Sequence, residues 1–191
     1  AKFMVDKEHR LFRTIISDNI VGVALDKMLD ELRYNRPAVL FVDNAYGQGL
    51  CRILNVSIQE RGGKITHKLP YTKNPTLKTY SDTDLYEIFQ PLHFETNDHE
   101  YPDVLVLIGY QNMLSQAVPY AIKKGLINNF FYVDRDIGLD LIKKQSSWQE
   151  LWENNSIFGV SPAAEPSGAN SVFENNYQNF CENQHEFPCP F

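Results

Sequence analysis

Residues 37–43 read PAVLFVD, a continuous apolar run that ends in a carboxylate. Two other runs have the same character, PDVLVLIGY at 102–110 and FFYVD at 130–134. Strands buried on both faces of a parallel sheet consist of such unbroken β-branched and aromatic residues, whereas half-exposed strands alternate. We therefore predict three central strands here, and two weaker ones at 64–71 (KITHKLPY) and 156–161 (SIFGVS).

The segments between these runs have helical periodicity. In 18–34, apolar residues recur at i, i+3, i+4 spacing, with Ser17 or Asp18 as the N-cap. Residues 48–61 repeat the pattern, and Gly62-Gly63 follows as a C-cap signal. Further helices are predicted at 113–124, near 82–89, near 137–144 and at roughly 167–180.

Strands that alternate with helices predict an α/β fold with three layers, α/β/α, around an open, mostly parallel sheet. We expect residues 1–161 to form one Rossmann-like lobe. The polar, turn-rich stretch 72–101 is interpreted as an elaborated surface connection within it. Residues 162–191 form a separate C-terminal segment.

The charge distribution excludes one class of function. The chain has 191 residues and a net charge of −6, and all eighteen Lys and Arg residues precede residue 145. Six glutamates follow Lys144 without any basic residue. Because no basic stripe is available, we predict no nucleic-acid partner. No apolar run reaches the ~20 residues that span a bilayer.

The cysteines and histidines do not indicate a metal site. Cys51 lies in a predicted helix and is expected to be buried, whereas Cys181 and Cys189 could pair in an oxidising compartment. No CxxC occurs, and the polar residues 93–100 (HFETNDHE) are better explained as a surface loop than as a metal cluster.

Common enzyme and cofactor motifs are absent as well. The sequence has no GxSxG, GxxxxGK[ST], GxGxxG or HExxH pattern. The YGQGL stretch at 46–50 contains only a GxG. We therefore predict no cofactor and no catalytic activity.

The strand ends indicate where a ligand would bind. In open α/β sheets, ligands bind beyond the carboxyl ends of the strands. The three main runs end in DNAYG (43–47), GYQN (109–112) and DRD (134–136). Tyrosines and a carboxylate on one rim suit a small zwitterion, because carboxylates pair with ammonium groups and phenols orient the ligand. The candidate ligand-binding residues are Ser17, Asp18, Tyr46, Tyr110 and Asp134.

Each of these positions has a structural alternative. Asn44 fits as the N-cap of the next helix, and Asp18 fits as an N-cap too. Tyr46 could equally pack against a loop, and Asp43 is typical of a hydrogen-bonding residue in a turn. Asp134 follows four apolar residues, so it must be solvated, paired or functional.

One enzymatic alternative remains. Asp134-Arg135-Asp136 after an apolar run is similar to the nucleophile and acid of haloacid-dehalogenase-type phosphotransferases. That chemistry requires a later cation for the phosphate and further acids for magnesium. No Lys or Arg follows Lys144, which disfavours this alternative.

Several segments together resemble the second lobe of type I periplasmic solute-binding proteins, the leucine/isoleucine/valine-binding protein family. The resemblance covers about residues 10–161. The segments are FRTIISD (12–18), AVLFVDNAYGQGL (38–50), ERGGKI (60–65), YPDVLVLIGY (101–110), AIKKGL (121–126) and FFYVD (130–134).

The resemblance implies roles for the same rim residues. Asp18, with Ser17 beside it, falls on an aspartate that helps to hold the ligand ammonium, and Tyr46 on a tyrosine that packs on the ligand. Tyr110 falls on a ring or small polar residue, and Asp134 on an ammonium-binding acid. Arg135-Asp136 replace a glycine-rich turn of the family, which fits a plain aliphatic amino acid less well.

The resemblance further implies an exported receptor, periplasmic or extracellular, that binds an amino acid or related polar solute. It would close on its ligand by hinge motion and serve an ABC transporter permease or a sensor. The chain would be one lobe that binds weakly or not at all by itself, and residues 162–191 would cross back toward the absent first lobe. An alternative with the same architecture is the effector domain of a sugar-responsive transcription regulator.

Overall fold

The computed structural model of the chain describes residues 18–72, 79–93, 101–133, 141–154 and 156–159, with side chains from residue 20 onward. These residues contain a five-stranded sheet with the spatial order β2-β1-β3-β4-β5, in which all neighbouring strands are parallel. The strands are β1 (Pro37–Val42), β2 (Lys68–Tyr71), β3 (Val104–Ile108), β4 (Phe130–Tyr132) and β5 (Ile157–Gly159).

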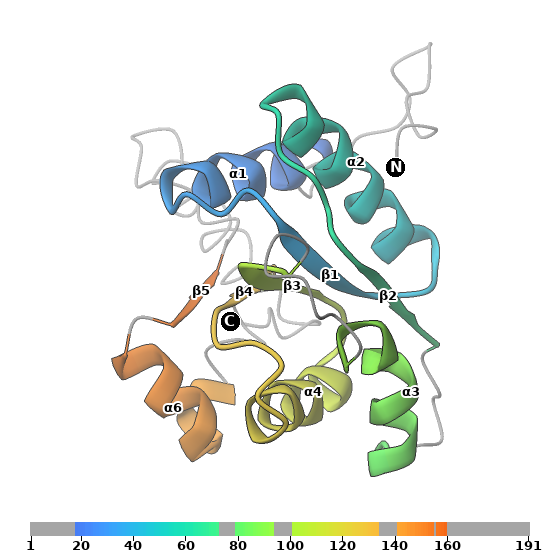
Figure 1. The fold of residues 1–191 in the computed structure, drawn as a ribbon, viewed down its shortest axis with the longest axis vertical. Helices are drawn as coiled ribbons and strands as arrows, with labels where there is room; N and C mark the ends of the chain where they lie inside the picture. Colours follow the sequence, from blue (N-terminus) through green and yellow to red (C-terminus); the bar gives the residue numbers. More distant parts are fainter. Residues whose placement is uncertain (1–17, 73–78, 94–100, 134–140, 155, 160–191) are drawn as a thin grey trace, which may run out of the picture. The chain divides into compact units, whose positions relative to one another are not determined.

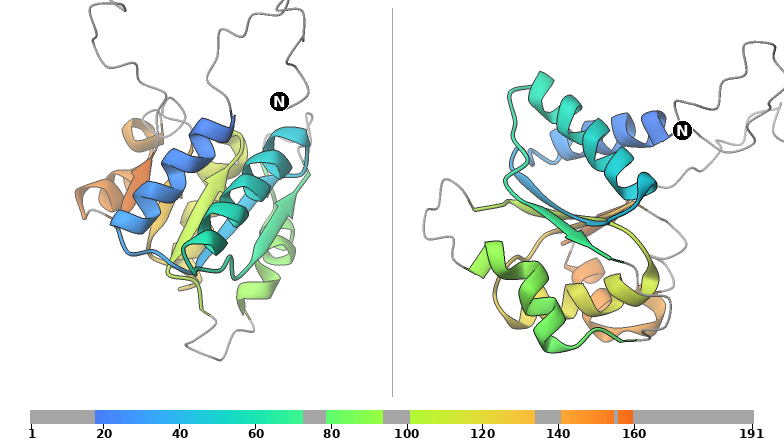
Figure 2. Two further views of the ribbon diagram at one scale, coloured as in Figure 1. Left: turned by 90° about the horizontal axis from the view of Figure 1, so that it is seen from above. Right: turned by 90° about the vertical axis from the view of Figure 1, so that its right-hand side faces the viewer.

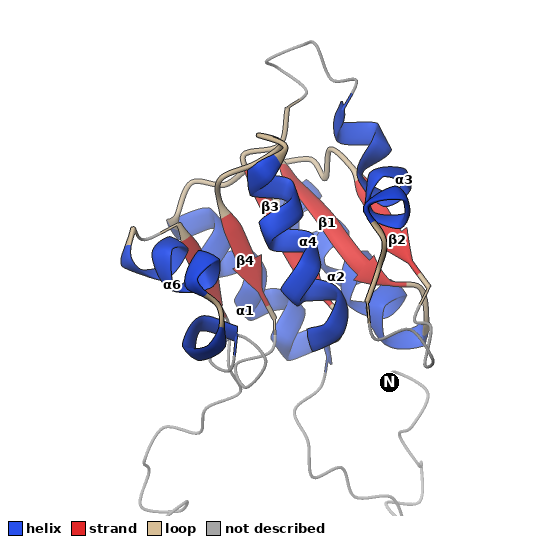
Figure 3. Ribbon diagram, turned by 90° about the horizontal axis from the view of Figure 1, so that it is seen from below, coloured by secondary structure: helices blue, strands red, loops and turns tan. Residues whose placement is uncertain are grey.

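Helices cover both faces of this sheet. They are α1 (Asp18–Glu31), α2 (Ala45–Glu60), α3 (Asp82–His93), α4 (Gln111–Lys123) and α6 (Ser146–Glu153), and residues 141–144 are also helical. Figure 1 shows α1 and α2 on one side of the sheet and α3, α4 and α6 on the other. Figure 2 shows α1 beside α2, and Figure 3 shows the opposite helix layer against the strands. The predicted α/β/α fold with an open parallel sheet is therefore confirmed.

The connections make the fold doubly wound. From β1 the chain passes through α2 to β2 on one side, and from β2 it returns through α3 to β3 on the other side of β1. The strand order thus reverses direction between β1 and β3. In open α/β sheets, this switch point is where the loops diverge and leave a crevice at the carboxyl edge.

The core explains why the central strands are apolar without alternation. All six residues of β1 are buried. Leu40 and Val42 pack in the cluster beneath α3, α4 and α6, whereas Val39 and Phe41 pack in the cluster beneath α1 and α2. Each successive side chain therefore faces a different helix layer, and both layers exclude water. 

Cys51 belongs to the α1/α2 side of this core. Its side chain is 4 % exposed, and its thiol is free. Burial raises the pKa of this thiol, which makes the reactive thiolate scarce. The prediction that Cys51 is buried is confirmed, whereas Cys181 and Cys189 lie outside the described residues.

Most predicted elements are present with shifted boundaries. The weak strand predicted over 64–71 is confined to β2, and α2 begins three residues earlier than the predicted 48–61. α6 is missing from the predictions because it has only eight residues, although Trp148, Leu151 and Trp152 form an apolar stripe at i, i+3 and i+4 spacing. The helix predicted at roughly 167–180 lies outside the described residues.

The interpretation of 72–101 as a surface connection needs correction. α3 lies within it, at the position where a helix near 82–89 is predicted, and it is not merely superficial. Leu85, Phe89 and Leu92 are buried against the sheet. Their i, i+4 and i+7 spacing forms an apolar stripe that the many flanking polar residues obscure.

Three helices end in the same hydrogen-bonding pattern. After α1, the Tyr34 N–H donates to the Leu29 carbonyl and the Arg33 N–H to the Asp30 carbonyl. α2 and α4 end in the same way, with Gly62 and Gly125 in the place of Arg33. This is the Schellman motif, whose C′ residue takes the left-handed conformation. Arg33, with φ of 61°, is the non-glycine example.

Arg33→Gly is therefore expected to raise the free energy of unfolding by about 1 kcal/mol, because a side chain with Cβ is disfavoured in this conformation. Urea unfolding of the 191-residue chain measures the change. The reverse substitution, Gly62→Ala, is the control: its φ is 83° and no atom lies within 4 Å of an added Cβ. It should lower stability by about 1 kcal/mol, and equal stability of both variants with the parent would contradict the prediction.

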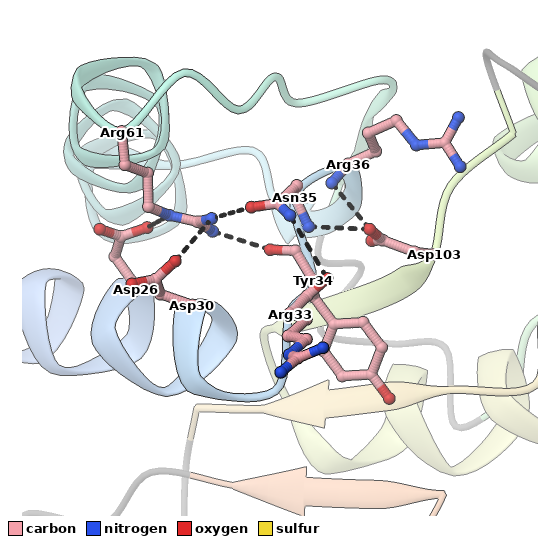
Figure 4. A network of polar contacts seen from close by, with 8 residues as sticks. All are labelled: Asp26, Asp30, Arg33, Tyr34, Asn35, Arg36, Arg61 and Asp103. Carbon is pink, nitrogen blue, oxygen red and sulfur yellow. Dashed lines mark hydrogen bonds and ion pairs between the residues drawn. The ribbon is translucent and has the colours of Figure 1, made fainter.

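A network of polar contacts lies at the amino edge of the sheet, opposite the edge with the switch-point loops (Figure 4). Arg61 at the end of α2 pairs with Asp26 at 2.8 Å and also donates to the Tyr34 carbonyl at 2.7 Å. Asp103, before β3, accepts the backbone N–H groups of Asn35 and Arg36 at 2.8 and 2.9 Å. The loop between α1 and β1 is thus held by Arg61 on one side and by Asp103 on the other.

Candidate functional site at the carboxyl edge

The loops after β1 and β3 meet at the switch point. The loop after β1 carries Asp43 and Asn44, and Tyr46 is the second residue of α2. The loop after β3 consists of Gly109 and Tyr110, and α4 begins at the next residue. Because β1 and β3 are neighbours, these segments lie at one place on the edge of the sheet.

Asn44 connects the two loops through its side-chain amide. Its Oδ1 accepts the Gly47 N–H at 3.0 Å and so caps α2, which confirms the predicted N-cap. Its Nδ2 lies 3.4 Å from the Tyr110 hydroxyl and donates to it. One side chain therefore satisfies the start of a helix and orients a tyrosine of the rim.

Asp43 has a structural role in the same loop. Its Oδ1 accepts a hydrogen bond of 2.7 Å from Gln48 Nε2, and its backbone N–H donates to the Tyr71 carbonyl. The prediction that Asp43 is a hydrogen-bonding turn residue is confirmed. The GxG of the YGQGL stretch also has a structural explanation, because a Cβ on Gly47 would lie 2.0 Å from the Val42 carbonyl oxygen.

The structure places two of the five sequence-predicted site residues. Tyr46 is 38 % exposed at the start of α2, and Tyr110 is half-buried at the start of α4. Asp18 is the first residue of α1, where the backbone alone is described. Ser17 and Asp134 lie outside the described residues, and so does the Asp134-Arg135-Asp136 segment of the phosphotransferase alternative. The five-residue site stays a prediction.

Sequence reasoning missed Tyr71, the last residue of β2. Its hydroxyl accepts the Tyr110 N–H at 2.9 Å, although β2 does not pair with β3. Burial raises the pKa of Tyr71 far above that of an ordinary tyrosine; the hydrogen bond from the Tyr110 N–H lowers it in part, and the nearby Tyr80, Tyr110 and Tyr46 hydroxyls raise it. The strand-end rule would have selected Tyr71 if it had been applied to the weak fourth strand as well.

The described residues contain no cluster of metal-binding side chains. No group of three His, Cys, Asp or Glu side chains among them could hold a metal ion. No helix of the described residues is both long enough and apolar enough to cross a bilayer.

The fold is that of type I periplasmic binding proteins. The family model described as "receptor family ligand binding region" matches residues 1–182, so the chain belongs to this family. None of the curated proteins matches the chain.

Solved structures with the same fold are distant in sequence. The chain is similar to an extracellular ligand-binding receptor from Verminephrobacter eiseniae (11 % identity, TM-score 0.54, covering 93 % of this chain and 47 % of that one). It is also similar to a periplasmic binding protein type 1 from Bordetella pertussis (15 %, 0.58, 91 % and 44 %). A third is a fatty acid ABC transporter substrate-binding protein from Thermomonospora curvata (13 %, 0.60, 90 % and 42 %). The chain spans less than half the length of each.

Proposed function

We propose that the chain is the second lobe of a two-lobed, exported receptor that binds a small polar solute at the β1/β3 switch point. One observation carries the proposal: in a chain of a ligand-binding family, Tyr46 at the start of α2 and Tyr110 just before α4 both lie at the edge where such folds bind ligands. Asn44 fixes one of them with a hydrogen bond.

The chemistry of this rim suits an amino acid or a related amine. The exposed ring of Tyr46 offers a flat apolar surface, and the Tyr110 hydroxyl offers both a donor and an acceptor. Asp18 and Asp134 would supply carboxylates for an ammonium group. A ring face next to a carboxylate binds a cation better than either group alone.

Hinge closure would complete the site. A ligand held between two lobes favours the closed state because it contacts both lobes only there. The closed receptor would then be recognised by an ABC transporter permease or a sensor, in the periplasm or outside the cell. Binding and release suffice for this role, so we propose no catalytic step.

The test is a titration of the ¹⁵N-labelled chain with each of the proteinogenic amino acids at millimolar concentration, followed by NMR. NMR detects weak binding, which a single lobe is expected to show. A ligand should shift the amide signals of residues 44–47 and 109–112, and it should leave those of Asn35 and Arg36 at the amino edge unchanged. Shifts confined to the amino edge, or none with any amino acid, would contradict the proposal.

Tyr46→Ala should weaken the binding seen in this titration by about tenfold, because an aromatic side chain at the centre of a site typically contributes more than 1 kcal/mol. Tyr86→Ala is the matched control. Tyr86 is a comparably exposed tyrosine, 43 % against 38 %, but it lies on α3 and stacks on His93. Equal affinities of the two variants would mean that Tyr46 does not contact the ligand.

A further inference from the structure

The Tyr71 side chain reaches from the end of β2 past β1 to the residues that follow β3. Tyr71 ends β2, and β1 lies between β2 and β3. The Tyr71 side chain is 2 % exposed and packs with Val42 of β1 in the core beneath α3, α4 and α6. Its hydroxyl nevertheless reaches the Tyr110 N–H beyond β3. The phenol thus connects the ends of three strands.

We infer that Tyr71 is a positioning residue of the ligand site, which sets the place of Tyr110 without touching the ligand. The inference rests on the proposed function for its effect on affinity. Tyr110 is the N-cap of α4, and its side chain makes no capping hydrogen bond to that helix. Its backbone is instead held by the Tyr71 hydroxyl, and its own hydroxyl is held by Asn44.

Gly109 shows how closely the Tyr71 hydroxyl fits under the loop. A Cβ at Gly109 would lie 2.0 Å from the hydroxyl oxygen and 2.9 Å from the ring carbon that bears it. No pair of atoms tolerates 2.0 Å without a shift, so any larger residue at 109 would displace either the phenol or the loop. The glycine therefore permits the hydrogen bond that Tyr110 receives.

Burial keeps the Tyr71 hydroxyl neutral, because it raises the pKa of this group well above the physiological range. A neutral phenol accepts the Tyr110 N–H and adds no charge under the rim. The hydrogen bond from the Tyr110 N–H to the Tyr71 hydroxyl should therefore not change between about pH 5 and pH 9, because the phenol stays protonated over this whole range.

Tyr71→Phe removes the acceptor and keeps the ring. Hydrogen exchange at the Tyr110 amide, read by NMR, should become faster by on the order of tenfold, because this amide loses its partner. Tyr80→Phe is the matched control. Tyr80 is also buried, packs edge-to-face on Tyr71 at 6.2 Å, and donates its hydroxyl to the Thr72 carbonyl at 3.4 Å. It should leave exchange at Tyr110 unchanged.

The second readout is affinity for the amino acid that binds in the titration above. Tyr71→Phe should weaken binding by about tenfold, the size of one lost hydrogen bond, whereas Tyr80→Phe should not. If no amino acid binds the parent chain, the proposed function fails, but exchange at Tyr110 still decides whether Tyr71 positions it. Equal exchange in both variants, or equal affinity where a ligand binds, overturns the inference.

A third variant covers the case that Tyr71→Phe does not fold. Gly109→Ala should displace the hydroxyl sterically and accelerate exchange at Tyr110 in the same way. Where Tyr71→Phe folds, a double-mutant cycle adds a further test: Gly109→Ala should cost less stability when combined with Tyr71→Phe than alone, since the 2.0 Å contact is then gone. Additive effects would show that the two residues do not act together and would count against the inference.

Discussion

Gly47→Ala is expected to lower the free energy of unfolding by about 3 kcal/mol or more, the upper range for overpacking in a core. The added Cβ would lie 2.0 Å from the Val42 carbonyl oxygen and 3.0 Å from its carbon. These are backbone atoms of the interior strand β1, which cannot rotate away as a side chain can. Relief would require α2 to move from β1, and Asn44 would then lose its capping contact with the Gly47 N–H.

The same helix offers a matched control for this substitution. Gly49 lies two residues further along α2, and no atom lies within 4 Å of an added Cβ. Gly49→Ala should therefore raise stability by about 1 kcal/mol, the difference in helix propensity between the two residues. Urea unfolding should therefore show changes of opposite sign in the free energy of unfolding of the two variants. A loss below 1 kcal/mol for Gly47→Ala would contradict the geometry.

Trp148→Ala should lower the free energy of unfolding by about 3–5 kcal/mol, the usual cost of truncating a large buried aromatic side chain. Trp148 is fully buried and is the buried residue of α6. Its ring lies against Tyr132 of β4, with the ring centroids 6.2 Å apart. Without this anchor, α6 would lose its hold on the sheet, and β5, which follows it directly, would lose its pairing with β4.

Two further variants separate packing from other effects of Trp148→Ala. Trp152, one turn later on α6, is 50 % exposed, and Trp152→Ala should change stability by no more than about 0.5 kcal/mol. The Trp148 indole N–H is buried and has no hydrogen-bond partner among the residues that the structure describes. Trp148→Phe removes this unsatisfied donor, so it should cost clearly less than Trp148→Ala. Equal losses at positions 148 and 152 would show that α6 is not anchored through Trp148.

The sequence predicted the fold because the central strands are unambiguous. PAVLFV at 37–42 can be buried on both sides only between two helix layers. Gly62 and Gly125 mark where α2 and α4 end. α6 was not predicted because it is short and its residues other than Trp148, Leu151 and Trp152 are polar. The Schellman end at Arg33 could not be predicted either, since its conformation is imposed by the hydrogen bonds of the folded chain.

The site was harder to predict than the fold. Asn44 and Asp43 were interpretable because caps and turns are local, and both interpretations are confirmed. Tyr71 could not be linked to Tyr110 from sequence, because 39 positions separate them and β1 lies between their strands in the sheet. Such a contact depends on strand order, which no local pattern encodes.

The position of β2 at the border of the sheet has a consequence for aggregation. The His67 and Tyr71 carbonyls accept from Val39 and Asp43 of the β1 side, so Lys68 and Pro70, which alternate with them, turn their backbone outward. Proline has no N–H to donate, and a lysine charge repels a second copy of the same strand. Both side chains are exposed. Within the part of the chain that the structure describes, β2 is therefore an edge strand that is a poor template for intermolecular strand pairing, which disfavours growth of the sheet into fibrils.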